Sequence, residues 1–166
     1  MLKLIAVAGL CLSAGCRTPT MGAVLQEKSR GGGSSRVYRT SPKQAWEIAL
    51  QVLRWEGAGT IEEHHEGQFM LTTIYDRYAA SAIGPMSYAG VWVEPASGGA
   101  EVTCVVDGQS FTEARFHRRF AQAVAFLEGG KPLPLAAPRE PPEDLQPCAS
   151  ASDCEIGVCV EGRCRR

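Results

Sequence analysis

The sequence predicts an α+β fold, in which two amphipathic helices pack on one face of an antiparallel sheet. Three observations lead to this prediction. Apolar residues recur at helical spacing near residues 42–57 and 110–127, four strand-like runs lie between these helices, and the runs form two hairpins that turn at Gly67 and at Ser97-Gly98-Gly99. Sequential hairpins favour antiparallel pairing, and amphipathic helices need a sheet face to cover their apolar stripes. We therefore predict a two-layer sandwich of order β-α-β-β-β-β-α over residues 36–130.

The first strand and the first helix follow one another directly. Residues 37–40 form a short strand-like run. Ser41 can cap a helix, Pro42 suits the first helical position, and Gln44 can complete a capping box. The apolar stripe of this helix ends before Gly57-Ala58-Gly59 and consists of Trp46, Ala49, Leu50 and Leu53.

The central strands and the last helix are read from alternation and capping signals. Strands are expected at residues 60–64, 68–75, 87–94 and 100–107. In the last of these, alternation turns Cys104 toward the core, where a free thiol behaves as a small hydrophobe. The final helix begins at the capping box Ser110-Phe111-Thr112-Glu113 and runs to Leu127. Its predicted buried stripe is Phe116, Phe120, Val124 and Leu127.

The first fifteen residues have the features of an export signal. Lys3 is followed by an uncharged apolar run that ends in small residues, and this run is too short to span about 30 Å of hydrocarbon. The segment Leu12-Ser13-Ala14-Gly15-Cys16 resembles the lipobox of bacterial lipoproteins, although Ser13 stands where that family usually has an apolar residue. The resemblance implies cleavage before Cys16 and acylation of its thiol. The alternative is cleavage by ordinary signal peptidase, which would leave a secreted protein with a free Cys16.

Two segments outside the predicted domain have the composition of linkers. Residues 16–35 contain Gly31-Gly32-Gly33-Ser34-Ser35 and lack periodicity, which predicts a flexible tether with an end-to-end distance of about 25 Å after the lipidated residue. Residues 131–147 contain six prolines and predict a semi-rigid spacer of about 3.1 Å per residue. Residues 148–166 then form a small cysteine-rich module.

The module contains four cysteines in the spacing C-x5-C-x4-C-x4-C, namely Cys148, Cys154, Cys159 and Cys164. In an exported protein this spacing predicts two disulfides, and a structural zinc site is the alternative. Of the three possible pairings we favour Cys148 with Cys159 and Cys154 with Cys164. The pattern also resembles the short cysteine-rich motifs that end many exported proteins of myxobacteria, which implies a structural or interaction module without an activity.

Charge and motifs restrict the possible functions. The formal net charge of the 166 residues is -1, so no basic excess points to nucleic acid. No nucleophile elbow, phosphate loop or metalloprotease motif is present, so we predict no enzyme activity, no catalytic residue and no cofactor. One cluster, His64-His65-Glu66, has metal-ligating chemistry and is assisted in principle by Glu113 and His117. Adjacent strand residues point to opposite faces, so we expect no metal site there and keep it as a weak alternative.

One sheet face is predicted to remain open. Tyr88 and Trp92 alternate away from the helices, with Val105 beside them on the neighbouring strand, and exposed aromatic patches often mark partner sites. The alternative is that the loop at 76–86 or the proline-rich tail covers them. We expect a membrane-anchored envelope lipoprotein that acts as a non-enzymatic interaction or scaffold component. Its partners would be the bilayer, through Cys16, and another envelope protein.

The expected location is the periplasmic side of the outer membrane. In lipoproteins, Asp after the acylated cysteine is associated with retention in the inner membrane, and this chain has Arg17 at that position. The element order is also similar to that of small accessory lipoproteins of outer-membrane assembly machinery. The alternatives are a secreted or cell-surface location and a periplasmic ligand- or metal-binding lipoprotein.

Overall fold

The predicted α+β architecture is present in a computed structural model of the chain, which describes residues 19–75, 86–108, 111–138, 158–160 and 163–165. The elements of the main domain are α1 (Met21–Ser29), β1 (Ser34–Tyr38), α2 (Pro42–Trp55), β2 (Ala58–His64), β3 (Phe69–Tyr75), β4 (Met86–Ala96), β5 (Gly99–Asp107) and α3 (Glu113–Glu128). A separate two-stranded hairpin is formed by β6 (Val158–Val160) and β7 (Arg163–Arg165).

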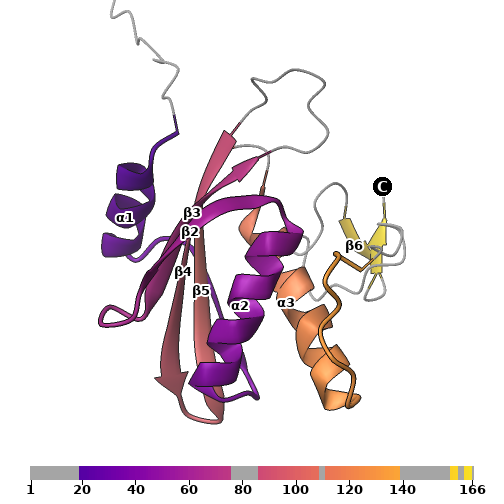
Figure 1. Cartoon of the computed structure of the whole chain (residues 1–166). Coiled ribbons are helices and arrows are strands. Elements are labelled where there is room, and N and C mark those ends of the chain that lie inside the picture. Colours follow the sequence, from indigo (N-terminus) through magenta and orange to yellow (C-terminus); the bar gives the residue numbers. More distant parts are fainter. Residues whose placement is uncertain (1–18, 76–85, 109–110, 139–157, 161–162, 166) are drawn as a thin grey trace, which may run out of the picture.

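The five strands of the domain form one antiparallel sheet in the order β1-β5-β4-β3-β2. Helices α2 and α3 cover one face, as the sequence predicts, and the short helix α1 lies on the opposite face (Figure 1). The main core therefore lies between the sheet and the α2–α3 pair. Its largest fully buried side chains include Phe116, Phe120, Ile48, Leu53 and Met70.

Both long helices begin at the predicted kind of cap. The Ser41 hydroxyl accepts a hydrogen bond from the Gln44 backbone N–H, and Pro42 is the first residue of α2. Helix α3 begins two residues later than predicted, because Thr112 rather than Ser110 caps it and accepts from the Arg115 backbone N–H. Cys104 is fully buried and free, as its place in the strand pattern predicts.

The prediction of a flexible tether over residues 16–35 is wrong for α1 and for the start of β1. Thr20 caps α1 and its backbone N–H donates to Asp107 Oδ2 at 2.8 Å. Val24 is fully buried against Leu71, Trp92 and Val105. A helix of nine residues is marginal in water. Burial of Val24, which stabilises by about 2 kcal/mol, therefore explains why it forms on the sheet.

The proline-rich spacer is also wrong in its first part, because residues 131–138 pack on the α2–α3 pair. Trp55 Nε1 donates to Pro134 O at 2.9 Å, and Gln51 Nε2 donates to the same oxygen at 3.2 Å. Leu133 and Ala137 pack against the main core. Carbonyl oxygens of a proline-rich segment have few N–H groups of their own to bond, so these side-chain donors hold the segment in place.

A buried charge cluster closes the α2–α3 interface beneath this segment. Glu56 is the C-cap of α2, and its carboxylate forms ion pairs with two arginines of α3. Its Oε2 lies 2.7 Å from Arg115 Nε, and its Oε1 lies 3.0 Å from Arg119 Nε. Arg119 Nη1 also donates to Pro138 O. Glu56 and Arg119 are only 7% and 6% exposed, so both charges lose most of their hydration on folding. Their mutual attraction offsets this loss.

We expect Glu56→Gln to lower the free energy of unfolding by about 3 kcal/mol, because it leaves two arginines beside a neutral group in a buried setting. Denaturant unfolding followed by circular dichroism measures the change. Glu47→Gln, an exposed substitution on the same helix, is the matched control and should change stability by about 0.5 kcal/mol or less. Equal effects of the two substitutions would contradict a structural role for the buried cluster.

Candidate functional site

The predicted partner face is covered by α1, so the prediction of an open aromatic patch is wrong. Trp92 is 8% exposed and Val105 is fully buried under Val24, while Tyr88 is half-buried at the margin of the same cluster. The alternative cover, the loop at 76–86, lies outside the described residues except for Met86, as does the proline-rich tail beyond residue 138. The segment read as a tether provides the cover, because its Ala23-Val24 pair supplies the apolar surface that the face lacks.

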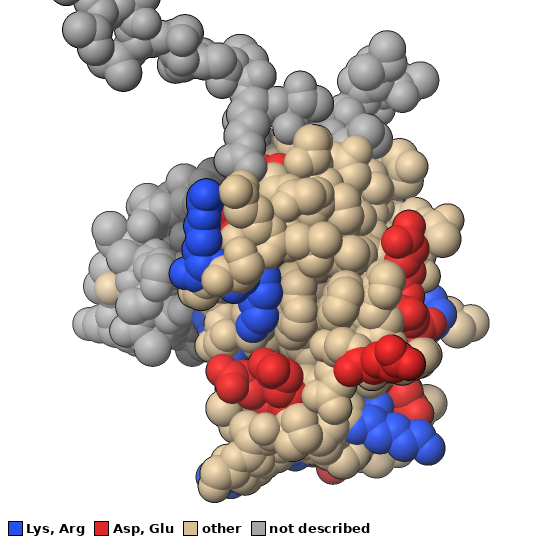
Figure 2. All heavy atoms as spheres, turned by 90° about the vertical axis from the view of Figure 1, so that its left-hand side faces the viewer, with Lys and Arg blue, Asp and Glu red and all other residues tan. Residues whose placement is uncertain are grey.

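Close approach of α1 depends on Gly90. A Cβ at this position would lie 2.6 Å from a ring carbon of Trp92 and 2.8 Å from Val24 Cγ1. At the other end of the helix, Lys28 Nζ lies 5.4 Å from the centre of the Trp92 ring and donates to Thr103 Oγ1 at 3.2 Å. Figure 2 shows the surface on the α1 side, where uncharged residues form the middle and acidic side chains gather lower down.

The weak metal alternative at His64, His65 and Glu66 is not assembled into a site. The His64 ring stacks on Phe69 on the α1 side of the sheet, with ring centres 4.5 Å apart. The His65 ring instead contacts Trp46 of α2 at 5.1 Å. The residues that the structure describes contain no group of three or more His, Cys, Asp or Glu side chains placed to hold a metal ion.

His65 belongs to a surface groove between the start of α2 and the β2–β3 turn. The groove has a volume of about 360 Å³, and we call it the Trp46 groove. Its lining residues are Pro42, Lys43, Trp46, Glu47, His65, Gln68 and Val93. Trp46 is half-buried, because one part of its ring packs against the main core and the rest lines the groove.

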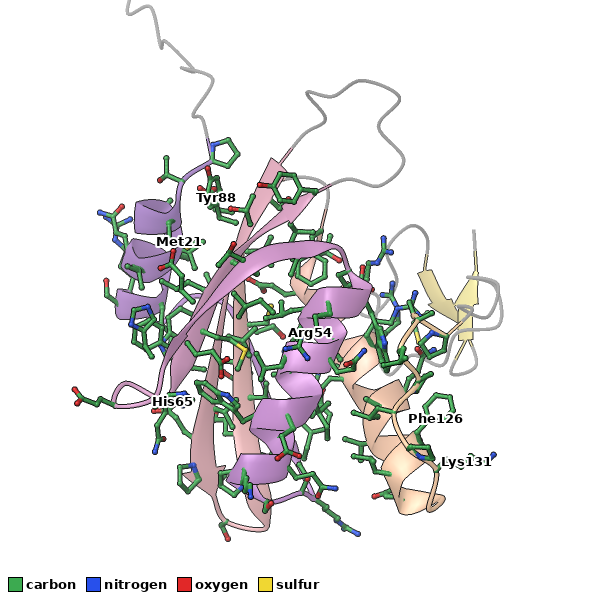
Figure 3. The ribbon with its side chains drawn as sticks, viewed as in Figure 1. Met21, Arg54, His65, Tyr88, Phe126 and Lys131 are labelled. Carbon is green, nitrogen blue, oxygen red and sulfur yellow. The ribbon has the colours of Figure 1, made fainter. Side chains whose placement is uncertain are left out.

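Two polar contacts orient the aromatic wall of the Trp46 groove. The indole N–H of Trp46 donates to Glu63 Oε2 at 2.7 Å, and His65 Nε2 lies 3.8 Å from the same oxygen. Glu63 thus bridges the helix and the turn. The imidazole remains 75% exposed, and His65 lies on the hairpin that projects from the sheet in Figure 3. Lys43 and Glu47 are exposed and place one charge of each sign on the rim.

The turn beneath the groove is held in one conformation. Gln68 has φ 52°, in the left-handed region that is uncommon for a residue with a side chain. Its backbone N–H donates to His65 O at 3.3 Å, and its carbonyl oxygen accepts from the Val93 N–H at 2.9 Å. These bonds fix the groove to β4, so its shape does not depend on a free loop.

A second surface hollow, of about 220 Å³, lies between the start of α2 and the end of α3. It is lined by Arg39, Thr40, Gln44, Ile48, Val124, Leu127 and Glu128. The Thr40 hydroxyl donates to Gln44 Oε1 at 2.7 Å, which engages two of its polar groups within the protein. This hollow has a smaller volume than the Trp46 groove and no aromatic side chain in its lining.

His117 is buried in the main domain, contrary to its reading as a helper of a surface metal site. Its Nε2 lies 2.8 Å from Ser34 O, and its Nδ1 lies 2.9 Å from the Tyr38 hydroxyl. A carbonyl oxygen can only accept, so Nε2 carries the proton and Nδ1 accepts from Tyr38. The side chain therefore joins α3 to β1 as a neutral imidazole.

Burial lowers the pKa of His117 to about 4, with the hydrogen bond to Ser34 opposing this shift and the charge of Arg36 adding to it. Burial also raises the pKa of the Tyr38 phenol and of the Cys104 thiol. The pKa of Glu113 is raised by burial, while a hydrogen bond from the Val106 N–H opposes the rise. These shifts all favour neutral groups beside the main core.

The residues predicted for lipidation and crosslinking lie mostly outside the described parts of the chain. This holds for Cys16, Cys148 and Cys154. Cys159 is half-buried and disulfide-bonded, and the β6–β7 register sets its Cα opposite that of Cys164. The favoured pairing of the four cysteines stays a prediction. Among the described residues, no helix has the length and apolar character needed to cross a membrane.

Comparison with protein-family models and with curated proteins found no match to this sequence. Among solved structures, protein CV1439 from Chromobacterium violaceum is similar to 57% of this chain over 93% of its own length, with 15% identity and a TM-score of 0.34. A likeness at this level supports no conclusion about function.

The buried His117 predicts a loss of stability in mild acid. Its pKa is about 4 in the folded protein and 6.5 when unfolded, so the unfolded chain binds the extra proton first as pH falls. The contribution of neutral His117 to the free energy of unfolding is fully present above pH 6.5 and is lost as the pH falls toward 4. The difference corresponds to about 3 kcal/mol. Urea titrations from pH 7.5 to 4 of the wild type and of His117→Gln measure it. Parallel pH profiles of the two proteins would contradict this assignment.

Proposed function

We propose that this protein is an exported lipoprotein, held to the outer membrane by acyl chains on Cys16, that binds another envelope protein through the Trp46 groove. The observation that supports the binding site is the groove itself. It presents part of an indole and an exposed imidazole in a concave surface of about 360 Å³. Tryptophan is enriched at protein interfaces because it buries a large apolar area and loses few rotamers.

The rim of the groove favours a protein segment as the bound partner. Lys43 and Glu47 flank Trp46 with charges of opposite sign, and the exposed His65 ring lines the groove on the side of the β2–β3 turn. An apolar side chain of a partner would contact Trp46 and Val93, while polar groups beside it would meet the rim charges. This arrangement matches the common interface pattern of an apolar centre within a polar margin. The role requires no reacting group.

The second candidate function is binding of a small ligand in the same groove. A volume of about 360 Å³ falls in the range of small-molecule sites, which run from about 300 to 1,000 Å³. Glu63 and Gln68 would then provide the polar contacts. Native mass spectrometry of protein purified without detergent distinguishes the two candidates, since a bound small molecule adds a discrete mass that Trp46→Ala removes.

We expect a photocrosslinking amino acid at position 43 to capture one envelope protein in intact cells. Adding Trp46→Ala should abolish that crosslink, because the groove then loses its main apolar contact. The same photocrosslinker at position 97, an exposed site on the β4–β5 turn, is the control and should not capture this protein. Thermal melts confirm that Trp46→Ala still folds. A crosslink that survives Trp46→Ala in a folded variant would exclude the groove as the binding site.

The lipid anchor is tested separately. In wild-type cells we expect the mature protein to carry acyl mass and to enter the detergent phase on phase partitioning. Cys16→Ala should move the protein to the aqueous phase, because a nonpolar anchor contributes about 0.8 kcal/mol for each buried CH₂ group. Intact mass spectrometry provides the readout. A mature wild-type protein without acyl mass would end the proposal of a lipoprotein, whatever the groove binds.

A further inference from the structure

Helix α1 places the folded body very near the predicted acylation site. The described chain is already fixed at Thr20, whose backbone N–H is bonded to Asp107 at the end of β5. From there Val24 and Lys28 attach the helix along the sheet. Only residues 17–19 separate Cys16 from Thr20. The long tether expected from composition is therefore reduced to a few residues.

A short connection limits how far the domain can stand from the lipid. Four residue steps from Cys16 to Thr20 span at most about 14 Å when fully extended. The interfacial layer on each side of a bilayer is itself about 5 to 8 Å thick. We propose that α1 holds the domain directly against the membrane, with the end of the sheet that carries Thr20, Tyr75 and Gly108 facing the lipid headgroups. This inference rests on the proposed acylation of Cys16.

The strand register defines which end faces the bilayer. Tyr88 pairs with Asp107 near the Thr20 end, whereas Ala96 pairs with Gly99 at the opposite end of the same hairpin. The eight residue steps of β4 between Tyr88 and Ala96 correspond to about 26 Å. Met21 and Tyr88 lie at the same end of the domain, and Lys131 lies toward the other end (Figure 3).

This orientation has a consequence for the Trp46 groove. Val93, which lines the groove, is five residue steps from Tyr88 along β4, or about 16 Å from the membrane-facing end. His65 also lies on the side away from Tyr88 in Figure 3. The groove therefore lies away from the headgroups and remains accessible to a protein partner.

Two adjacent residues of α1 provide a matched pair of variants. Val24 is fully buried in the contact with the sheet, whereas Leu25 is 42% exposed on the same helix. Val24→Asp buries a charge without a partner and should detach α1, which returns residues 16–33 to a flexible linker. Leu25→Asp adds the same charge to the same helix and should leave the docked helix in place.

Labelling from the membrane surface tests the proposal. The full-length acylated protein is placed in vesicles of phosphatidylglycerol and phosphatidylethanolamine, part of the latter carrying a diazirine on its headgroup, and adducts are mapped by mass spectrometry. We expect peptides containing Thr20, Tyr75 and Gly108 to be labelled severalfold more than the hairpin around Ser97. Leu25→Asp should preserve this ratio. Val24→Asp should bring it close to one while the protein still floats with the vesicles.

Intact mass and flotation separate the possible failures. Acylated, vesicle-bound wild type with equal labelling at both ends would overturn the close orientation and leave the lipid anchor standing. A labelling ratio that is unchanged in Val24→Asp, with circular dichroism showing a folded domain, would also overturn it, because α1 would then not set the distance. Protein that lacks acyl mass and does not float would remove the anchor, and with it this inference.

Discussion

Burial of Val24 against Leu71, Trp92 and Val105 is the contact on which the second face of the sheet depends. Helix α1 is too short to persist alone, and the aromatic face is too apolar to remain in water without cost. The helix covers the apolar face, and the face gives the helix the tertiary contacts that stabilise it. Gly90 leaves the space for this approach, since a side chain there would collide with Trp92 and Val24. A five-stranded sheet that has long helices on one face is thereby covered on both.

The segment after α3 is likewise held in place by contacts with residues far away in the sequence. Residues 131–138 lie on α2 and α3 because Trp55, Gln51 and Arg119 donate to their carbonyl oxygens. Arg119 is itself held by buried Glu56, so the attachment of this segment is coupled to the helix interface. Segments with the composition of linkers thus belong to the folded unit, which extends from residue 19 to residue 138 among the described parts.

The elements that could be predicted are those with a strong local signal. Ser41-Pro42 and the apolar stripe after it predict α2, and strand alternation predicts the burial of Cys104, because these patterns arise within one element. Helix α1 has only a Thr20 cap and a short Ala23-Val24-Leu25 run, and its stability comes from residues far along the chain. The covered aromatic face and the Trp46 groove depend on such long-range packing. Helical spacing places Trp46 in the apolar stripe of α2, but it does not predict that the ring lies at the margin of the core.

The proposed anchor and the proposed binding surface lie on separate parts of the molecule, and this separation has a structural cause. Asp107 fixes Thr20 at one end of the central hairpin, while the Gln68 turn fixes the groove to β4 nearer the other end. The two attachments lie on the paired strands β5 and β4 of one hairpin, so the distance between them is set by the sheet and not by a linker. Under the proposed acylation of Cys16, a partner in the groove would therefore meet the protein at a defined height above the lipid. In the proposed arrangement, docking of α1 would set the position of the domain, and Trp46 with His65 would provide recognition.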